Sequence, residues 1–314
     1  MLRIALPNKG RLADEARSLF AEAGLGVRAL GDRALTASLG GEFQALFVRA
    51  QDVAEFVADG AADAGVTGWD LVAESDRSLV TLLDLEFGRC RLVVASHEDS
   101  GITSLDEITD HRVATVFPRL TRAFFATLGR PVSIVPVSGA AEVAPHLGIA
   151  DVIVDLVSTG STLKTNGLRE LGTVLESTAR LIAPAQGGFA ATVHNATTAA
   201  STVVPVIDAA AAVGSSAAAK RRADLDDLVT ALDSVVRGRG KRYLMANVPR
   251  TVLERVTAVL PGLNGPTVTN ILNGHDMVAV HAVVPADGIY RTIAALKALG
   301  AEGILVTRIE RLLP

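Results

Sequence analysis

A phosphate-binding turn is the first chemistry that the sequence indicates. The apolar run that begins at Asp151 ends abruptly in small hydroxyl residues around one glycine, in the order Ser158-Thr159-Gly160-Ser161-Thr162. An apolar run bounded by turn residues is typical of a buried strand. The turn fits the start of a helix, where free backbone N–H groups and hydroxyls can cradle a phosphate. We therefore expect these five residues to bind a phosphorylated ligand.

Two carboxylates, Asp151 and Asp155, precede this turn. Residues four apart on a strand point to the same face, so both carboxylates could flank one ligand. Sugar hydroxyls and Mg²⁺ both bind to oxygen groups of this kind. The alternative for this stretch is a buried strand followed by an N-capped helix, with no ligand at all.

Charged residues and one glycine follow expected strands in the first third of the chain. They are Lys9, Gly10, Arg11, Arg49 and Asp70. Ligands of α/β units bind at the carboxyl ends of strands, where these residues would lie. Their cations could hold the anionic groups of a phosphorylated ligand. Each charge taken alone could instead be an ordinary solvated loop charge.

Strands and helices alternate along the part of the chain that must position these residues. Expected strands are 2–6, 34–39, 43–48, 64–66, 79–83, 89–95, 112–116, 132–137, 151–157, 173–176 and 179–183, and expected helices are 12–23, 120–128, 142–147, 225–236 and one that opens at Gln51. This alternation predicts an α/β fold of two blocks with mostly parallel sheets, and the last two strands are expected to return to the first block.

The C-terminal segment has a different order. Strands at 242–248, 267–271, 276–284 and 304–310 with helices at 250–259 and 289–299 give β-α-β-β-α-β, the ferredoxin-like unit. Such a module on an α/β enzyme is often regulatory, by analogy of fold alone. Residues 184–219, rich in Ala, Ser, Thr and Gly, are expected to form an insertion or linker, ordered or disordered.

Composition excludes several classes of protein. A net charge of −4 and an aromatic content of 4% disfavour a nucleic-acid binder. The single cysteine, Cys90, rules out a disulfide framework and is expected to be a small buried hydrophobe. The six histidines show no metal-ligand spacing, so we expect no structural zinc. No signal peptide or membrane-spanning run is indicated, and we expect a cytoplasmic location.

Several motifs in order resemble ATP phosphoribosyltransferase. They are Pro7-Asn8-Lys9-Gly10-Arg11-Leu12, Gly65-Val66-Thr67-Gly68-Trp69-Asp70 and the stretch 151–163. Residues 261–267, Pro-Gly-Leu-Asn-Gly-Pro-Thr, are similar to the regulatory domain of the family's long form. The resemblance covers Met1 to about Ala183 and then about Leu225 to the end.

The resemblance implies a reaction and an architecture. Adenine N1 of ATP attacks phosphoribosyl pyrophosphate (PRPP), giving phosphoribosyl-ATP and pyrophosphate with Mg²⁺, as the first step of histidine biosynthesis. The implied fold is a two-lobed catalytic part of the type II periplasmic-binding-protein kind. Lobe I would be 1–95, completed by part of about 179–236, and lobe II would be 96–178 with the PRPP loop. An ACT-like regulatory domain at 240–314 would follow, with histidine as feedback inhibitor and a dimer-to-hexamer assembly.

The resemblance also assigns roles to residues. PRPP falls on Ser158, Thr159, Gly160, Ser161 and Thr162, beside the catalytic carboxylates Asp151, Asp155 and Glu142. ATP and pyrophosphate fall on Lys9, Gly10, Arg11, Arg49 and Asp70. The effector site falls on Asn247, Leu263, Thr267, Val283 and Gly303. Glu142 could otherwise be a helix N-terminal acid favoured by the helix dipole.

The chain departs from the family pattern at three places, one of which is the 184–219 region, because it is longer than the family's usual crossover. We expect Arg-Pro-Lys-Asp around Arg49, but the sequence has Gln51 where that pattern has a cation. Asn247 stands where an acidic effector contact is expected, which weakens the grip on an amino group. The alternative function is a non-catalytic cytoplasmic two-lobed sensor of small molecules, and an assay for phosphoribosyl-ATP distinguishes it from the enzyme.

Overall fold

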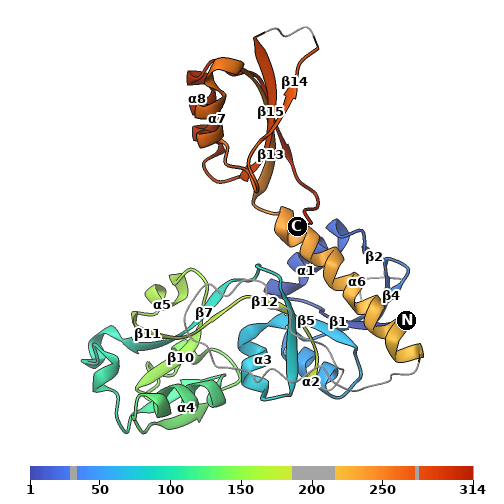
Figure 1. The fold of residues 1–314 in the computed structure, drawn as a ribbon. Coiled ribbons are helices and arrows are strands. Elements are labelled where there is room, and N and C mark those ends of the chain that lie inside the picture. Colours follow the sequence, from blue (N-terminus) through green and yellow to red (C-terminus); the bar gives the residue numbers. More distant parts are fainter. Residues whose placement is uncertain (29–33, 186–215, 273–275, 314) are drawn as a thin grey trace. The chain divides into compact units, whose positions relative to one another are not determined.

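The chain folds into two compact units, Met1–Val229 and Thr230–Pro314. Figure 1 shows the computed structural model, which describes residues 1–28, 34–185, 216–272 and 276–313. The first unit contains two β-sheets, which we call the first and the second lobe together with their helices. The second unit contains one sheet.

The first lobe is built on a seven-stranded sheet of order β2-β3-β4-β1-β5-β12-β6. Its strands are β1 (Arg3–Pro7), β2 (Val27–Arg28), β3 (Thr36–Leu39), β4 (Phe43–Val48), β5 (Ala64–Gly68), β6 (Leu79–Asp84) and β12 (Ala179–Pro184). Its helices are α1 (Arg11–Glu22), η1 (Ala50–Asp52), α2 (Val53–Ala58) and α3 (Trp69–Ser75). One face of α1 is apolar and buried, and Val53 and Val57 of α2 pack near Ala5 of the central strand β1.

The second lobe is built on a five-stranded sheet of order β11-β7-β10-β8-β9. Its strands are β7 (Cys90–His97), β8 (Arg112–Thr115), β9 (Ser133–Pro136), β10 (Val152–Val157) and β11 (Leu168–Ser177). Its helices are η2 (Glu98–Ser100), η3 (Leu105–Glu107), α4 (Pro118–Thr127), η4 (Ala141–Val143) and α5 (Ser161–Thr165). Because β7 lies in this sheet, the border between the lobes falls before Cys90 and not after residue 95.

The expected return of the chain to the first lobe is confirmed for the second of the two strands, whereas the first stays in the second lobe. Strand β11 pairs with β7 in the second sheet, and β12 then pairs with β5 and β6 in the first. The connections β6–β7 and β11–β12 therefore join the two sheets. This is the two-lobed arrangement of the type II periplasmic-binding-protein kind.

The expectation of mostly parallel sheets is wrong. Strand β1 is parallel to β4 and β5, and β8 is parallel to β9 and β10. Other pairs are antiparallel, including β3–β4, β5–β12 and β7–β10. The reason is the short connections, because parallel neighbours need a crossover whereas β3 and β4 are joined by a turn at Gly40 and Gly41, both with positive φ. Strands β11 and β12, which only Thr178 separates, pass from the second sheet to the first, and β12 runs antiparallel to β6 as β11 does to β7.

The helix expected at 142–147 is reduced to the single 3-10 turn η4. Pro145 has no N–H to continue a helical hydrogen-bond ladder, so the chain turns there instead. The expected linker is shorter than 184–219 at both ends, because β12 extends to Pro184 and α6 (Ser216–Gly238) begins at Ser216. Residues 186–215 of that expected linker lie outside the described residues.

The last part of the chain has the expected ferredoxin-like order. It comprises β13 (Lys241–Pro249), η6 (Arg250–Val252), α7 (Leu253–Val259), β14 (Thr267–Asn270), β15 (Met277–Pro285), α8 (Ile289–Ala298) and β16 (Glu302–Arg308). The sheet order is β14-β15-β13-β16, with antiparallel pairing at each step. Alternate residues of β13 (Leu244, Ala246 and Val248) are fully buried in one core with Val256 of α7 and Leu296 of α8. Among the described residues, no helix combines the length and the apolar composition that crossing a membrane requires.

Candidate active site

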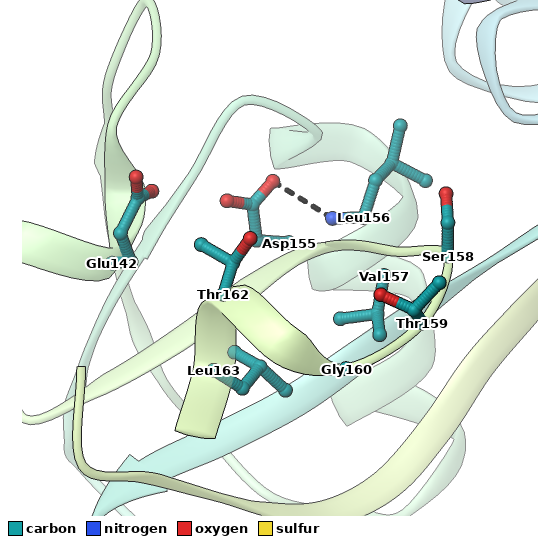
Figure 2. A pocket seen from close by; sticks show the side chains of 9 residues that line it. All are labelled: Glu142, Asp155, Leu156, Val157, Ser158, Thr159, Gly160, Thr162 and Leu163. Carbon is teal, nitrogen blue, oxygen red and sulfur yellow. Dashed lines mark hydrogen bonds between the residues drawn. The ribbon is translucent and has the colours of Figure 1, made fainter. Parts of the chain in front are cut away.

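A pocket of about 160 Å³ lies where β10 ends. Its wall comprises Glu142 of η4, the end of β10, the turn after it and the start of α5, as Figure 2 shows. The lining residues are Glu142, Asp155, Leu156, Val157, Ser158, Thr159, Gly160, Thr162 and Leu163. Four of the five residues of the predicted phosphate turn thus line one pocket together with two of the predicted carboxylates. Ser161, the fifth, begins α5.

The local sequence explains why the turn forms here. Gly160 has φ +79° and ψ 0°, a left-handed conformation that other residues rarely adopt. It precedes the five-residue helix α5, which no side chain caps. Leu163 is buried in the core below the turn with Val157 and fixes the helix there. The predicted strand, turn and helix over 151–163 are therefore confirmed as structure, and the hydroxyls of Ser158, Thr159 and Thr162 border the pocket.

Asp155 gives the pocket its electrostatic character. Its carboxylate accepts the N–H of Leu156 at 2.7 Å, the dashed bond in Figure 2. Burial raises the pKa of Asp155, the nearby charge of Glu142 raises it further, and the Leu156 N–H lowers it. Two carboxylates that repel each other in one pocket favour a ligand that brings hydroxyl donors or a cation.

Asp151 lies elsewhere, and the expectation that it shares a ligand with Asp155 is not met. It immediately precedes β10, and its carboxylate accepts the backbone N–H of Arg112 at 2.9 Å and its guanidinium at 2.7 Å. These hydrogen bonds lower the pKa of Asp151. Four residues of extended chain span about 13 Å, so alternation can place the two carboxylates on one face and still leave them too far apart to share a ligand. Arg112 is a partner that the sequence did not indicate.

The predicted nucleotide loops lie at one edge of the first sheet. Lys9 and Arg49 follow the adjacent parallel strands β1 and β4, and both are exposed. The N–H of Asn8 donates to the carbonyl of Val48 at 2.8 Å, which joins the two loops. Gly10 has φ +86° and starts α1. These loops leave two cations free to meet an anionic ligand.

Arg11 and Asp70 are engaged inside the first unit. Arg11 donates to the carbonyl oxygen of Gly88. Asp70 is only 1% exposed, and its Oδ1 accepts from the hydroxyl of Ser177 at 2.5 Å. Asp70 therefore stands behind the nucleotide loop and not on its surface. Ser177 is not among the residues predicted from the sequence, because no local motif marks it as a partner of Asp70. Cys90 lies nearby and is 3% exposed, and burial raises the pKa of its thiol.

The predicted effector residues are spread over the C-terminal sheet. Asn247 and Gly303 are neighbours, since a Cβ on Gly303 would lie 3.3 Å from the Asn247 side-chain nitrogen. Thr267 is paired with His281, Val283 with Tyr243, and Leu263 is exposed in the turn before β14. Asn247, Thr267 and Val283 lie on the sheet face turned away from α7 and α8.

The described residues offer no protein cage for a metal ion. Among them no three His, Cys, Asp or Glu side chains lie close enough together to hold one. An ion in the pocket would therefore use Glu142 or Asp155 together with oxygens of a bound ligand. Mg²⁺ is commonly held in this way, by one or two carboxylates plus phosphate oxygens.

Comparison with known proteins identifies the relatives of this chain. The profile of the family described as HisG, ATP phosphoribosyltransferase, matches residues 49–199, and that of the HisG C-terminal domain matches residues 238–311. The ATP phosphoribosyltransferase of Gemmatimonas aurantiaca is 63% identical over 318 residues, with both chains covered completely. That of Natronomonas pharaonis is 46% identical over 314 residues, again with complete coverage.

A solved structure agrees with these relatives. The ATP phosphoribosyltransferase HisG:HisZ complex from Thermotoga maritima contains a chain that is 30% identical, with a TM-score of 0.51. The match covers 58% of this chain and 86% of that one. Fold, motifs and full-length identity agree, and the chain therefore belongs to the ATP phosphoribosyltransferase family, whose reaction is the first step of histidine biosynthesis.

Proposed function

We propose that the pocket at the end of β10 binds the donor, PRPP, in the transfer of its phosphoribosyl group to N1 of the adenine of ATP. One observation supports this most directly: the left-handed Gly160 turn and the partly buried Asp155 line the same pocket. The turn offers N–H groups and hydroxyls to a phosphate, while the carboxylate offers acceptors to sugar hydroxyls a few ångströms away. A phosphorylated sugar carries both kinds of group.

The chemistry needs no covalent intermediate with the protein. A bond forms between adenine N1 and the anomeric carbon of ribose, and the bond from that carbon to pyrophosphate breaks. Positive charge develops on the sugar during the transfer. The carboxylates of Asp155 and Glu142 stabilise that charge and orient the ribose through its hydroxyls, so catalysis rests on position and electrostatics.

Mg²⁺ is the proposed cofactor. The two carboxylates of the pocket fit an ion that is also coordinated by oxygens of the donor. One or two carboxylates are the usual protein ligands at Mg²⁺ sites of this kind. When bound, Mg²⁺ neutralises charge on the pyrophosphate leaving group. The residues that hold its coordination shell would be Asp155 and Glu142.

ATP is proposed to bind at the exposed loops of the first lobe. Lys9, Gly10 and Arg49 lie there, and the two cations suit a triphosphate or the departing pyrophosphate. Because Gln51 replaces an expected cation, Lys9 and Arg49 carry more of this charge balance. Arg11 and Asp70 act indirectly by fixing the loops, since both are bonded within the first unit.

The C-terminal unit is proposed to bind histidine as a feedback inhibitor and to support dimer-to-hexamer assembly in the cytoplasm. Support comes from the HisG C-terminal profile and from an outer sheet face on which Tyr243 and Leu305 are exposed. Calorimetry of the full chain with histidine should detect binding that Asn247→Leu weakens. Absence of heat would confine this unit to assembly, which light scattering with and without histidine would measure.

An activity assay tests the main proposal. Purified protein is mixed with ATP, PRPP and Mg²⁺, with and without pyrophosphatase to remove the product that drives the reverse reaction. Phosphoribosyl-ATP should form, and EDTA should stop its formation. Absence of product in both arms contradicts the proposal and returns a non-catalytic sensor to consideration.

A further inference from the structure

Helix α3 of the first lobe caps a helix of the second lobe. The carboxylate of Glu74, near the end of α3, accepts the backbone N–H of Arg119 at 2.8 Å and that of Leu120 at 2.9 Å. Both N–H groups belong to the first turn of α4, where a helix cannot satisfy them internally. A side chain from one lobe thus performs the capping of a helix in the other.

The first turn of α4 depends on this contact. Its N-cap residue, Phe117, has no polar side chain, although its own N–H donates to the hydroxyl of Thr115 at 2.9 Å. Pro118 at the first helical position has no N–H to satisfy. The remaining two orphan donors, on Arg119 and Leu120, are the ones that Glu74 accepts. Removing the Glu74 carboxylate would leave both of these partly buried groups without a partner.

Other contacts hold α3 against the second lobe. Leu71 packs on the second-lobe core that contains Phe117 and Phe125. Asp76, just after α3, pairs with the Arg119 guanidinium, although both side chains are exposed and such pairs contribute little. At the other end of α3, the hydroxyl of Ser177 contacts Asp70. Glu74 and the Asp70–Ser177 pair are therefore two polar links that hold α3 of the first lobe against the second lobe.

The cap links the elements that lie next to the two proposed substrate sites, one in each lobe. Helix α3 follows β5, a neighbour of β1, whose carboxyl end leads into the Lys9 loop. Helix α4 follows β8, the parallel neighbour of β10, whose carboxyl end carries the donor pocket. A contact between α3 and α4 thus sets the first-lobe loops against the second-lobe turn.

We propose that Glu74 is a positioning residue for phosphoribosyl transfer, which sets the two lobes in the arrangement that brings adenine N1 to the donor. This inference rests on the proposed function, because it takes ATP on the first lobe and PRPP on the second. A misplacement of about 1 Å between reacting groups can cost roughly a hundredfold in rate. Loss of the cap should therefore lower kcat while each substrate still binds its own lobe.

Three variants separate this role from simple stabilisation. Glu74→Ala removes both acceptor oxygens and should lower kcat about tenfold to a hundredfold with KM for either substrate changed by less than about threefold. Glu74→Gln keeps one acceptor oxygen of the same reach but presents an NH2 donor to the second N–H, so it should restore only part of kcat. The control Glu15→Ala removes an exposed glutamate from α1 of the first lobe and should change neither constant. If Glu74→Ala does not fold, Glu74→Asp, one methylene shorter, replaces it.

Distances between the lobes supply the second readout. Nitroxide labels on Asp14→Cys in α1 and Ser133→Cys in β9 occupy exposed positions on the two lobes, while the native Cys90 is buried. In the full chain, double electron–electron resonance should give a broader distribution of the distance between the two labels for Glu74→Ala than for the Glu15→Ala control. An unchanged distribution, or an unchanged kcat in an active enzyme, overturns the inference. A wild type that forms no phosphoribosyl-ATP contradicts the proposed function instead.

Discussion

Asp151 and Asp155 are four residues apart, Asp151 just before β10 and Asp155 within it, and only Asp155 lines the donor pocket. Asp151 is held by the guanidinium and the backbone N–H of Arg112. The Asp151 carboxylate thus binds Arg112 just before the strand, and the Asp155 carboxylate lies beside the phosphate turn that follows the strand. The pair provides a matched comparison, because the same substitution can be made at both positions.

Replacing each aspartate by asparagine should separate catalysis from structure. Asp155→Asn removes a charged acceptor of the sugar hydroxyls, and such hydrogen bonds contribute about 1.5–3 kcal/mol. We expect kcat/KM for PRPP to fall roughly tenfold to a hundredfold. Asp151→Asn should keep kcat/KM within about threefold of the wild type. Steady-state kinetics measure both, and equal losses in the two variants would contradict the assignment.

The same two variants should change stability in opposite directions at neutral pH. The raised pKa of Asp155 means that its charged form is disfavoured by folding, so Asp155→Asn should stabilise the free protein. The lowered pKa of Asp151 means that its charge favours folding, so Asp151→Asn should destabilise it, by no more than about 1 kcal/mol because the pair with Arg112 is exposed.

At low pH, both variants should approach the stability of the wild type. The wild type gains stability relative to Asp155→Asn and loses stability relative to Asp151→Asn. The wild type regains the stability lost at Asp155 as the pH falls below the raised pKa of that group and the native carboxyl binds its proton. It loses the contribution of Asp151 as the pH falls below about 3.9 toward the lowered pKa. Thermal melts of the three proteins from pH 7 to pH 3 provide the test, and a gap between Asp155→Asn and wild type that widens toward pH 4 would refute it.

Local patterns made the donor turn readable from the sequence. The apolar run at 152–157 and the Ser-Thr-Gly-Ser-Thr segment each specify their own backbone conformation, and Gly160 does adopt the left-handed form. The ferredoxin-like order at the C-terminus was readable for the same reason, since its strands alternate buried and open residues. Structural features that are determined by residues close together in the sequence can be predicted from the sequence.

Hydrogen-bond and ion-pair partners that are distant in the sequence could not be predicted from it. Asp70 sits in a motif that suggests ligand binding, yet its position is decided by Ser177, 107 residues away. Asp151 finds Arg112 across 39 residues, and Glu74 finds Arg119 across 45. The direction of β12 could not be predicted because it is set by pairing with β5 and β6, which lie about a hundred residues earlier in the chain. Each of these depends on tertiary pairing and not on local pattern.

Gly160→Val should weaken donor binding beyond its effect on stability. A β-branched residue disfavours φ +79° by about 1–2 kcal/mol, and its side chain would occupy the rim of the pocket. Gly129→Val is the matched control, since Gly129 also has positive φ with open space around it but follows α4, outside the pocket lining. Both variants should lose similar stability, and only Gly160→Val should raise KM for PRPP at least tenfold. A similar rise in both would attribute the effect to strain.

Ser177→Ala tests whether Asp70 supports the nucleotide loop from behind or touches the ligand. The Ser177 hydroxyl donates to Asp70 Oδ1 at 2.5 Å and accepts the Asp70 N–H at 3.0 Å, so alanine leaves two buried groups unsatisfied. We expect unfolding in urea to need about 1–3 kcal/mol less, with KM for ATP changed by less than about threefold. The control Ser133→Ala, at an exposed site on β9, should leave the urea midpoint unchanged. Unchanged stability together with a several-fold higher KM for ATP would instead make Asp70 a direct nucleotide contact.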